Sequence, residues 1–95
     1  MSLEDQTLAY IVDPFILLNY NEAYLQTRVN KATTEGFYWV QLPREQLIIP
    51  EQNIFLKEND AKQAAREMIE VTIRKIKIDS YHKTNSLRKI LLEKL

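Results

Sequence analysis

The run Asp79-Ser80-Tyr81-His82 brings together the residue types of a hydrolytic site, and it contains the only histidine of the chain. A hydroxyl group becomes a strong nucleophile when an imidazole removes its proton and a carboxylate orients that imidazole. Side chains that are adjacent in the sequence are seldom aligned for this transfer, because a triad depends on geometry. We therefore interpret these residues as a solvated turn between two helices, and we predict that the chain is not an enzyme.

The composition offers little for metal or nucleotide chemistry. The chain has no cysteine and one histidine, and it lacks the acidic loop that binds calcium. Gly36 is the only glycine, which excludes a glycine-rich phosphate-binding loop. Glu67 and Glu70 form a carboxylate pair, but Arg66 and Arg74 lie close to them in a helical pattern, so ion pairs along a helix explain them. We predict no metal ion and no cofactor.

The aromatic run Phe37-Tyr38-Trp39 has two interpretations. It could form a stacking platform for single-stranded nucleic acid, as small β-barrels sometimes do. It could also be part of the core, because a small sheet needs large side chains on its buried face. We favour the core, since basic residues do not alternate with the aromatic ones as a nucleic-acid groove requires.

The net charge is zero, but the charges are unevenly distributed. Residues 1–71 hold six basic and eleven acidic residues, whereas residues 72–95 hold seven basic and two acidic ones. A basic tail can bind an anionic partner, fold onto its own acidic half, or pair with a second chain in the opposite orientation. The simplest interpretation is a helix with a solvated basic face.

A nucleic-acid-binding accessory protein is the alternative function that this tail suggests, although we do not favour it. We expect weak or no binding at physiological salt, because binding through phosphate contacts weakens steeply as salt rises. The residues that would make these contacts are Arg74, Lys75, Lys77, Lys83, Arg88 and Lys89.

Short segments rich in strand-forming residues fill the first half of the chain. The expected strands cover residues 8–12, 24–29, 37–42, 46–50 and 53–56, and residues 15–18 form either another strand or a buried turn. Gly36 is the natural residue for a hairpin turn because it adopts positive φ at little cost. Strands this close in sequence favour an antiparallel meander. We expect a small antiparallel sheet or a partly open barrel.

Alternation within residues 37–42 predicts which side chains share a face of the sheet. The side chains of Phe37, Trp39 and Gln41 should lie on one face, and those of Tyr38, Val40 and Leu42 on the other.

A helix should begin at Asn59 or Asp60, whose side chains can accept hydrogen bonds from its first turn. An apolar stripe then recurs at three- and four-residue spacing and comprises Ala61, Ala64, Ala65, Met68, Ile69, Thr72, Ile73 and Ile76. We expect the helix to reach residue 78, although residues 71–78 also alternate partly as a strand. Residues 79–85 read as a break, and Thr84 or Asn85 would then cap a last helix.

The order of residues between the last strand and the first long helix resembles that of small bacterial and phage-type proteins of uncharacterised function, which have an SH3-like barrel followed by a C-terminal helix. The matching positions are Ile49, Pro50, Asn53, Ile54, Phe55, Leu56, Ala61 and Ala64. They cover about a third of the chain and mark a strand-to-helix junction. The resemblance implies an SH3-like fold and a bacterial or prophage setting, and it carries no catalytic residue.

The last helix is apolar for its length and is the predicted association surface. Its candidate contact residues are Leu87, Ile90, Leu91, Leu92 and Leu95. A short helix needs a surface to pack on, which is either its own sheet or a second chain. We favour a second chain, because the strand half is small, and expect a homodimer with twofold symmetry.

These observations predict an α+β protein with a small antiparallel β domain at residues 1–56 and a helical extension at residues 57–95. No apolar run reaches the roughly 18 residues of a membrane-spanning helix, and the absence of cysteine fits a reducing compartment. We expect a cytoplasmic, non-enzymatic protein–protein interaction or assembly module. Its partner and pathway cannot be read from the sequence.

Overall fold

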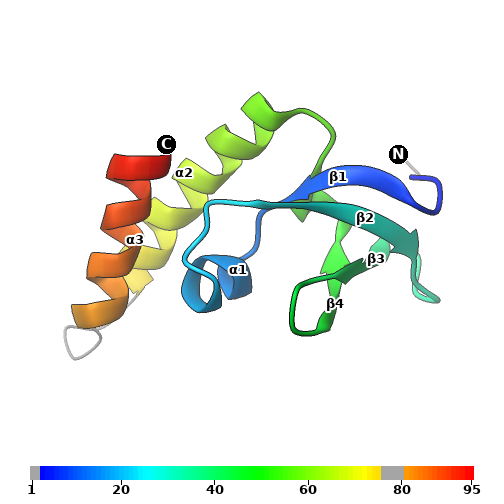
Figure 1. Ribbon diagram of the computed structural model, residues 1–95, viewed down its shortest axis with the longest axis horizontal. Coiled ribbons are helices and arrows are strands. Elements are labelled where there is room, and N and C mark those ends of the chain that lie inside the picture. Colours follow the sequence, from blue (N-terminus) through cyan, green and yellow to red (C-terminus); the bar gives the residue numbers. More distant parts are fainter. Residues whose placement is uncertain (1–2, 76–80) are drawn as a thin grey trace.

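In the computed structural model, which describes residues 3–75 and 81–95, the chain forms a curled antiparallel sheet followed by two long helices (Figure 1). The described strands are β1 (Thr7–Ile11), β2 (Leu25–Lys31), β3 (Phe37–Gln41), β4 (Gln46–Pro50) and β5 (Ile54–Phe55). The described helices are α1 (Pro14–Asn19), the 3-10 turn η1 (Glu51–Asn53), α2 (Glu58–Lys75) and α3 (Tyr81–Lys94). The predicted α+β class is confirmed.

The strands lie in the order β4-β3-β2-β1-β5, and every pair is antiparallel. Strands β1 to β4 form a meander, and β5 then returns to the outer side of β1, where Ile54 pairs with Ile11. The sheet is thus a half-barrel, which is compatible with the SH3-like fold that the resemblance implies.

The turn at Gly36 and the alternation of β3 are as predicted. Gly36 has φ of +84°, and β3 pairs with β4 so that Trp39 lies opposite Ile48. Tyr38 and Val40 are buried inside the half-barrel, whereas Trp39 is on the opposite face.

The segment after β1 is a helix, and the prediction of a strand or turn at residues 15–18 is wrong. Asp13 is the N-cap of α1, because one of its carboxylate oxygens accepts a hydrogen bond from the backbone N–H of Phe15 at 2.9 Å. Pro14 occupies the first turn, where a missing N–H costs nothing. The same Asp-Pro pair that stops β1 therefore also starts α1.

Helix α2 begins at Glu58, so Asn59 and Asp60 lie within its first turn, and the prediction that one of them caps the helix is wrong. The structure makes residues 71–75 helical, so the strand alternative fails for them, while the rest of that prediction, residues 76–78, lies outside the described residues. Helix α3 begins at Tyr81, so the predicted break is wrong for residues 81–85, and residues 79–80 lie outside the described part of the chain. The prediction that Thr84 or Asn85 caps this helix is also wrong, because both lie within it. The tendency of the long last segment to continue as a helix overrides their capping preference.

Among the described residues, two groups of buried side chains hold the fold together, and α1 belongs to both. The first fills the half-barrel and includes Ile11 and Ile16. The second lies between the end of β1 and the helices, and includes Val12, Leu17 and Leu87. Ile11 at the end of β1 and Val12 directly after it thus point into different groups, as do Ile16 and Leu17 of α1. This arrangement fixes the helices relative to the sheet.

Candidate interaction surface

An apolar patch lies on the outer face of β3 and β4, the face opposite the interior of the half-barrel. It consists of Phe37, Trp39 and Ile48, which are 38%, 40% and 49% exposed. Trp39 lies directly opposite Ile48 on the neighbouring strand, and Phe37 lies opposite Pro50. Cross-strand neighbours on one face have Cβ atoms about 4.5–5.5 Å apart. We call Phe37, Trp39 and Ile48 the Trp39 patch.

The position of the helices explains why the Trp39 patch is exposed. Helix α2 contacts β5 and β1, at the opposite edge of the sheet from β4 (Figure 1). The prediction that the aromatic run belongs to the core is therefore correct only for Tyr38, which is 4% exposed. Phe37 and Trp39 face the side of the sheet that no described helix covers at β3 and β4.

A polar border formed by Arg28 and Asn30 of β2 and by Gln6, which precedes β1, adjoins the Trp39 patch. Asn30 lies opposite Trp39, and its Oδ1 atom accepts hydrogen bonds from the backbone N–H and the Nε2 atom of Gln6 at 3.0 and 2.8 Å. Arg28 donates from a guanidinium nitrogen to the Gln6 carbonyl oxygen at 3.0 Å. Gln6 has φ of +64° and bends the chain into these contacts. The border is held in place by the fold.

Strand β4 is an edge of the sheet, and its hydrogen bonding can be assigned residue by residue. Leu42 donates its N–H to the carbonyl oxygen of Glu45 at 2.8 Å, which closes the turn between β3 and β4. Alternate residues of an antiparallel strand bond to the same neighbour, so Leu47 bonds to β3. Gln46 and Ile48 then direct their N–H and C=O groups away from β3, toward the open edge.

The predicted association surface on α3 is largely covered by its own chain. Leu87 and Ile90 are buried in the group of side chains shared with α1 and α2, and Leu91 and Leu95 pack partly against it. Only Leu92, which is 87% exposed, points fully into solvent among the five. Association through Leu87 and Ile90 would require α3 to detach, because the second core that the sequence did not reveal already buries them.

The predicted phosphate contacts are spread over the two long helices. Arg74 and Lys75 are exposed at the end of α2, and Arg88 and Lys89 are exposed on α3. The side chains of Lys77 and Lys83 lie outside the described part of the chain, as does the side chain of His82. In Figure 1 the helices α2 and α3 lie to the left of β3 and β4, so the basic residues and the Trp39 patch do not form one surface.

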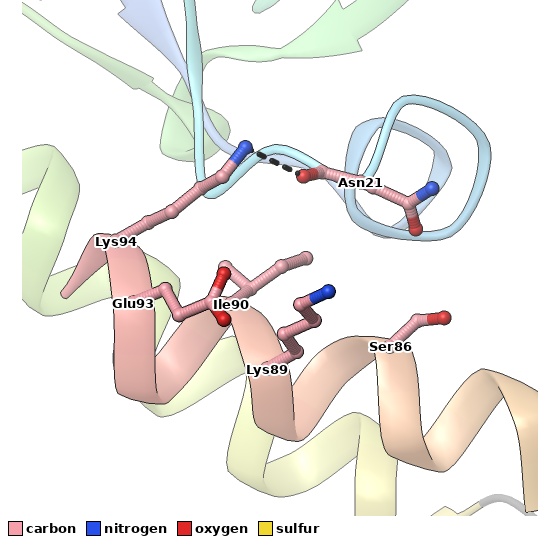
Figure 2. Close-up of a pocket in the computed structure, with 6 residues that line it drawn as sticks. All are labelled: Asn21, Ser86, Lys89, Ile90, Glu93 and Lys94. Carbon is pink, nitrogen blue, oxygen red and sulfur yellow. Dashed lines mark hydrogen bonds between the residues drawn. The ribbon is translucent and has the colours of Figure 1, made fainter.

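A hollow of about 330 Å³ separates α3 from the loop after α1 (Figure 2). Its lining comprises Asn21, Ser86, Lys89, Ile90, Glu93 and Lys94. The Nζ atom of Lys94 donates to the Asn21 carbonyl oxygen at 3.1 Å and lies 2.8 Å from a carboxylate oxygen of Glu22. In the described residues no hydrogen bond joins Ser86 to Lys89. Lys94 bridges this hollow between α3 and the loop after α1. The side chains that line the hollow do not form an aligned catalytic set.

A second hollow, of about 590 Å³, lies between β5 and α2. Its apolar lining includes Phe55, Met68 and Val71, and Glu67 and Lys75 also line it. Glu67 interacts within its own helix, since its Oε1 accepts a hydrogen bond from Gln63 at 3.0 Å. The start of α1 and the turn η1 complete the lining through Pro14, Gln52 and Asn53. Asn53 donates its side-chain bond to Asp13, so Asn53 and Glu67 of this hollow are engaged with their own neighbours.

Metal ligands do not cluster in residues 3–75 and 81–95, where no group of three or more histidine, aspartate or glutamate side chains could hold an ion. Within the same residues, no helix is both long enough and apolar enough to cross a bilayer. Comparison of the chain with protein-family models, curated proteins and solved structures gives no match. The candidate site therefore has to be judged from its own geometry.

The sequence contains a signal for the Trp39 patch in the alternation of its strands. The segment 46–50 alternates as β3 does, so the residues opposite Trp39 should share its face. The sequence thus predicts that Ile48 and Trp39 lie side by side on one face of the sheet. It does not predict whether that face is exposed, because this depends on where α2 packs.

Proposed function

We propose that the chain is a non-enzymatic protein-interaction or assembly module that binds its partner through the outer face of β3 and β4. The exposed row of Trp39 and Ile48 on an uncovered sheet face carries this proposal. Tryptophan is enriched among the residues that contribute most to protein interfaces. The bacterial or prophage setting implied by the resemblance belongs to the same proposal.

The energetics of the Trp39 patch favour a partner surface over a structural role. Covering the remaining exposed area of each of its three side chains would contribute about 1 kcal/mol. That total alone is modest against the entropic cost of association, so the partner must also contact neighbouring groups. The polar border supplies such groups, because Arg28 and Asn30 are already held by Gln6 and lose little freedom on binding.

Co-purification from cells of the source organism tests this function. Tagged wild-type chain, Trp39→Ala and the control Leu92→Ala would be compared by quantitative mass spectrometry. Leu92 is also an exposed apolar residue, but it lies on α3. We expect a protein recovered with wild type and with Leu92→Ala to fall by at least about tenfold with Trp39→Ala. Equal recovery of every protein with all three chains would contradict the proposal.

Nucleic-acid binding is the second candidate, and one observation favours it. The rings of Phe37 and Trp39 are exposed, and Arg28 points to the same face of the sheet from β2, an arrangement that can stack bases and contact phosphates. The basic residues of α2 and α3 lie away from these rings, which limits the surface. We therefore rank this function below protein binding.

Tryptophan fluorescence separates the two candidates, because Trp39 is the only tryptophan of the chain. Titration with single-stranded oligothymidine should leave the emission unchanged at physiological salt if the surface binds protein. Strong quenching that weakens as salt rises would promote nucleic-acid binding. Charge reversal at Arg28 and at Arg88 would then show whether the sheet or the helix makes the phosphate contacts.

A further inference from the structure

The two edge strands of the half-barrel differ in length and in whether a helix contacts them. The edge at β5 is only two residues long, and α2 contacts it. The edge at β4 spans five residues, Gln46–Pro50, and none of them is charged. Natural sheets usually blunt a long edge with charges, bulges or a covering segment, since unpaired N–H and C=O groups recruit other strands. Here Pro50 is the one such device on β4, at its last position.

We infer that β4 pairs in antiparallel fashion with β4 of a second copy of this chain, so that two half-barrels share one continuous sheet. This inference rests on the proposed function, because it names the partner of β4 and of the adjoining Trp39 patch. The edge-directed groups of Gln46 and Ile48 supply the hydrogen bonds. A second copy offers the same uncharged edge, so no ionised side chain within the strand loses its water on pairing.

One register of this pairing keeps charged residues of the same sign apart. With Leu47 opposite Leu47 of the second copy, Gln46 lies opposite Ile48, and both residues direct N–H and C=O groups at each other. Glu45 then lies opposite the apolar Ile49. Four backbone hydrogen bonds form in this register, two for each symmetry-related pair of Gln46 and Ile48.

The neighbouring register is less favourable. With Ile48 opposite Ile48 of the second copy, Glu45 would lie opposite Glu51, and like charges facing each other across strands are destabilising. That register would also place Gln46 opposite Pro50, which has no N–H to donate.

The pairing also extends the Trp39 patch. On the outer face, Ile48 of each chain comes beside Gln46 of the other, with the two Ile48 side chains diagonal to one another and one Trp39 on either side. An apolar band then runs across the junction, and cross-strand contacts between β-branched and aromatic residues stabilise sheets. A foreign peptide would match only half of this symmetric band, so we favour the second copy as the occupant.

Amide hydrogen exchange measured beside sedimentation tests the inference. At a protein concentration low enough for sedimentation to show a monomer, the N–H groups of Leu47 and Ile49 should exchange slowly and those of Gln46 and Ile48 quickly. At high micromolar concentration the chain should sediment as a dimer, and all four should be protected. Fast exchange at Gln46 and Ile48 in a dimer would overturn the inference, as would a chain that stays monomeric.

The variant Ile48→Lys should raise the dimer dissociation constant by at least about tenfold, because a lysine within an edge strand is a natural block to strand pairing. Ile48 is half exposed, so the variant should keep the circular dichroism spectrum of wild type. The control Leu92→Lys makes the same kind of change on α3 and should dimerise like wild type. A dimer lost in Leu92→Lys and kept in Ile48→Lys would place the interface on α3 and contradict the inference.

The two proposals can fail separately. A monomeric chain that still loses a co-purified protein on Trp39→Ala would reject self-pairing and keep the interaction function. A dimer with protected Gln46 and Ile48 that recovers no Trp39-dependent protein would support self-pairing as the function of the surface.

Discussion

Asn53 donates a hydrogen bond from Nδ2 to a carboxylate oxygen of Asp13 at 3.1 Å, across forty residues of sequence. The other carboxylate oxygen of Asp13 caps α1 through the N–H of Phe15. The carbonyl oxygen of Asn53 accepts a third bond, from the N–H of Val12 at 3.0 Å. Asp13 and Asn53 therefore together end β1, start α1 and hold the turn that leads into β5.

Replacing Asp13 by alanine should lower the free energy of unfolding by about 1–2 kcal/mol, because it removes the cap of α1 and leaves Asn53 without this acceptor. Asp13→Asn keeps a capping oxygen and should lose less. Urea unfolding at neutral pH measures both. A loss of the same size in the two variants would show that the cap contributes little.

Tyr38 and Trp39 are adjacent but should respond differently to truncation. Tyr38 is buried, and its hydroxyl oxygen accepts a hydrogen bond from the N–H of Leu3 at 2.9 Å. Tyr38→Ala should cost about 3–5 kcal/mol, as large-to-small core changes do. Trp39→Ala should cost about 1–2 kcal/mol, because much of the ring is already in water. Denaturation at low protein concentration measures the difference, and similar losses would contradict the assignment of the two faces.

The position of α3 against its own chain can be tested in the same way. Leu87 is fully buried and Leu92 is exposed, although both are leucines of one helix. Leu87→Ala should lower the free energy of unfolding by about 2–5 kcal/mol, and Leu92→Ala by less than about 0.5 kcal/mol. These values should not depend on protein concentration. A marked concentration dependence confined to Leu87→Ala would instead favour a helix that is packed between chains.

The raised pKa of Tyr24 leads us to expect that the fold loses stability at alkaline pH. Burial, and then the nearby carboxylate of Glu58, raise the pKa of Tyr24 above its ordinary value of about 10. The neutral phenol therefore stabilises the fold. Its contribution is fully present below the unfolded-state pKa and is lost as the pH rises through the folded-state pKa.

Urea unfolding of wild type and Tyr24→Phe between about pH 8 and pH 12 measures this effect. The stability of wild type should fall more steeply above about pH 10 than that of the variant, which has no phenol at this position. Parallel pH profiles would show that Tyr24 titrates alike in the folded and unfolded chains. The two proteins differ only at this position, so the difference between the profiles isolates Tyr24.

The local chemistry of the sequence was enough to predict much of the sheet. Gly36 identified a turn because positive φ is costly for other residues, and alternation placed Tyr38 and Trp39 on opposite faces. The helix at α1 was missed because a short apolar segment suits a strand as well as a helix. The Asp13-Pro14 pair was read as the end of a strand, although Asp at the cap and Pro in the first turn also favour a helix start.

The surface could not be predicted to the same extent, because exposure depends on where distant elements pack. Nothing in the run Phe37-Tyr38-Trp39 says that α2 packs at the β5 edge and leaves the outer side of β3 open. The same is true of α3, whose leucines read as a surface for another chain. Leu87 is instead buried with Val12 and Leu17, residues seventy or more positions earlier in the sequence.

The placement of Ile16 and Leu17 in different groups of buried side chains has a consequence for cooperativity. A rotation of α1 that improved the packing of one group would withdraw a side chain from the other, so the two groups cannot loosen independently. Heat or urea should therefore melt the half-barrel and the helices in one transition. Residues 1–56 alone would expose Val12, Leu17 and Ala23 to water, so the strand half and the helical half should not be stable when separated.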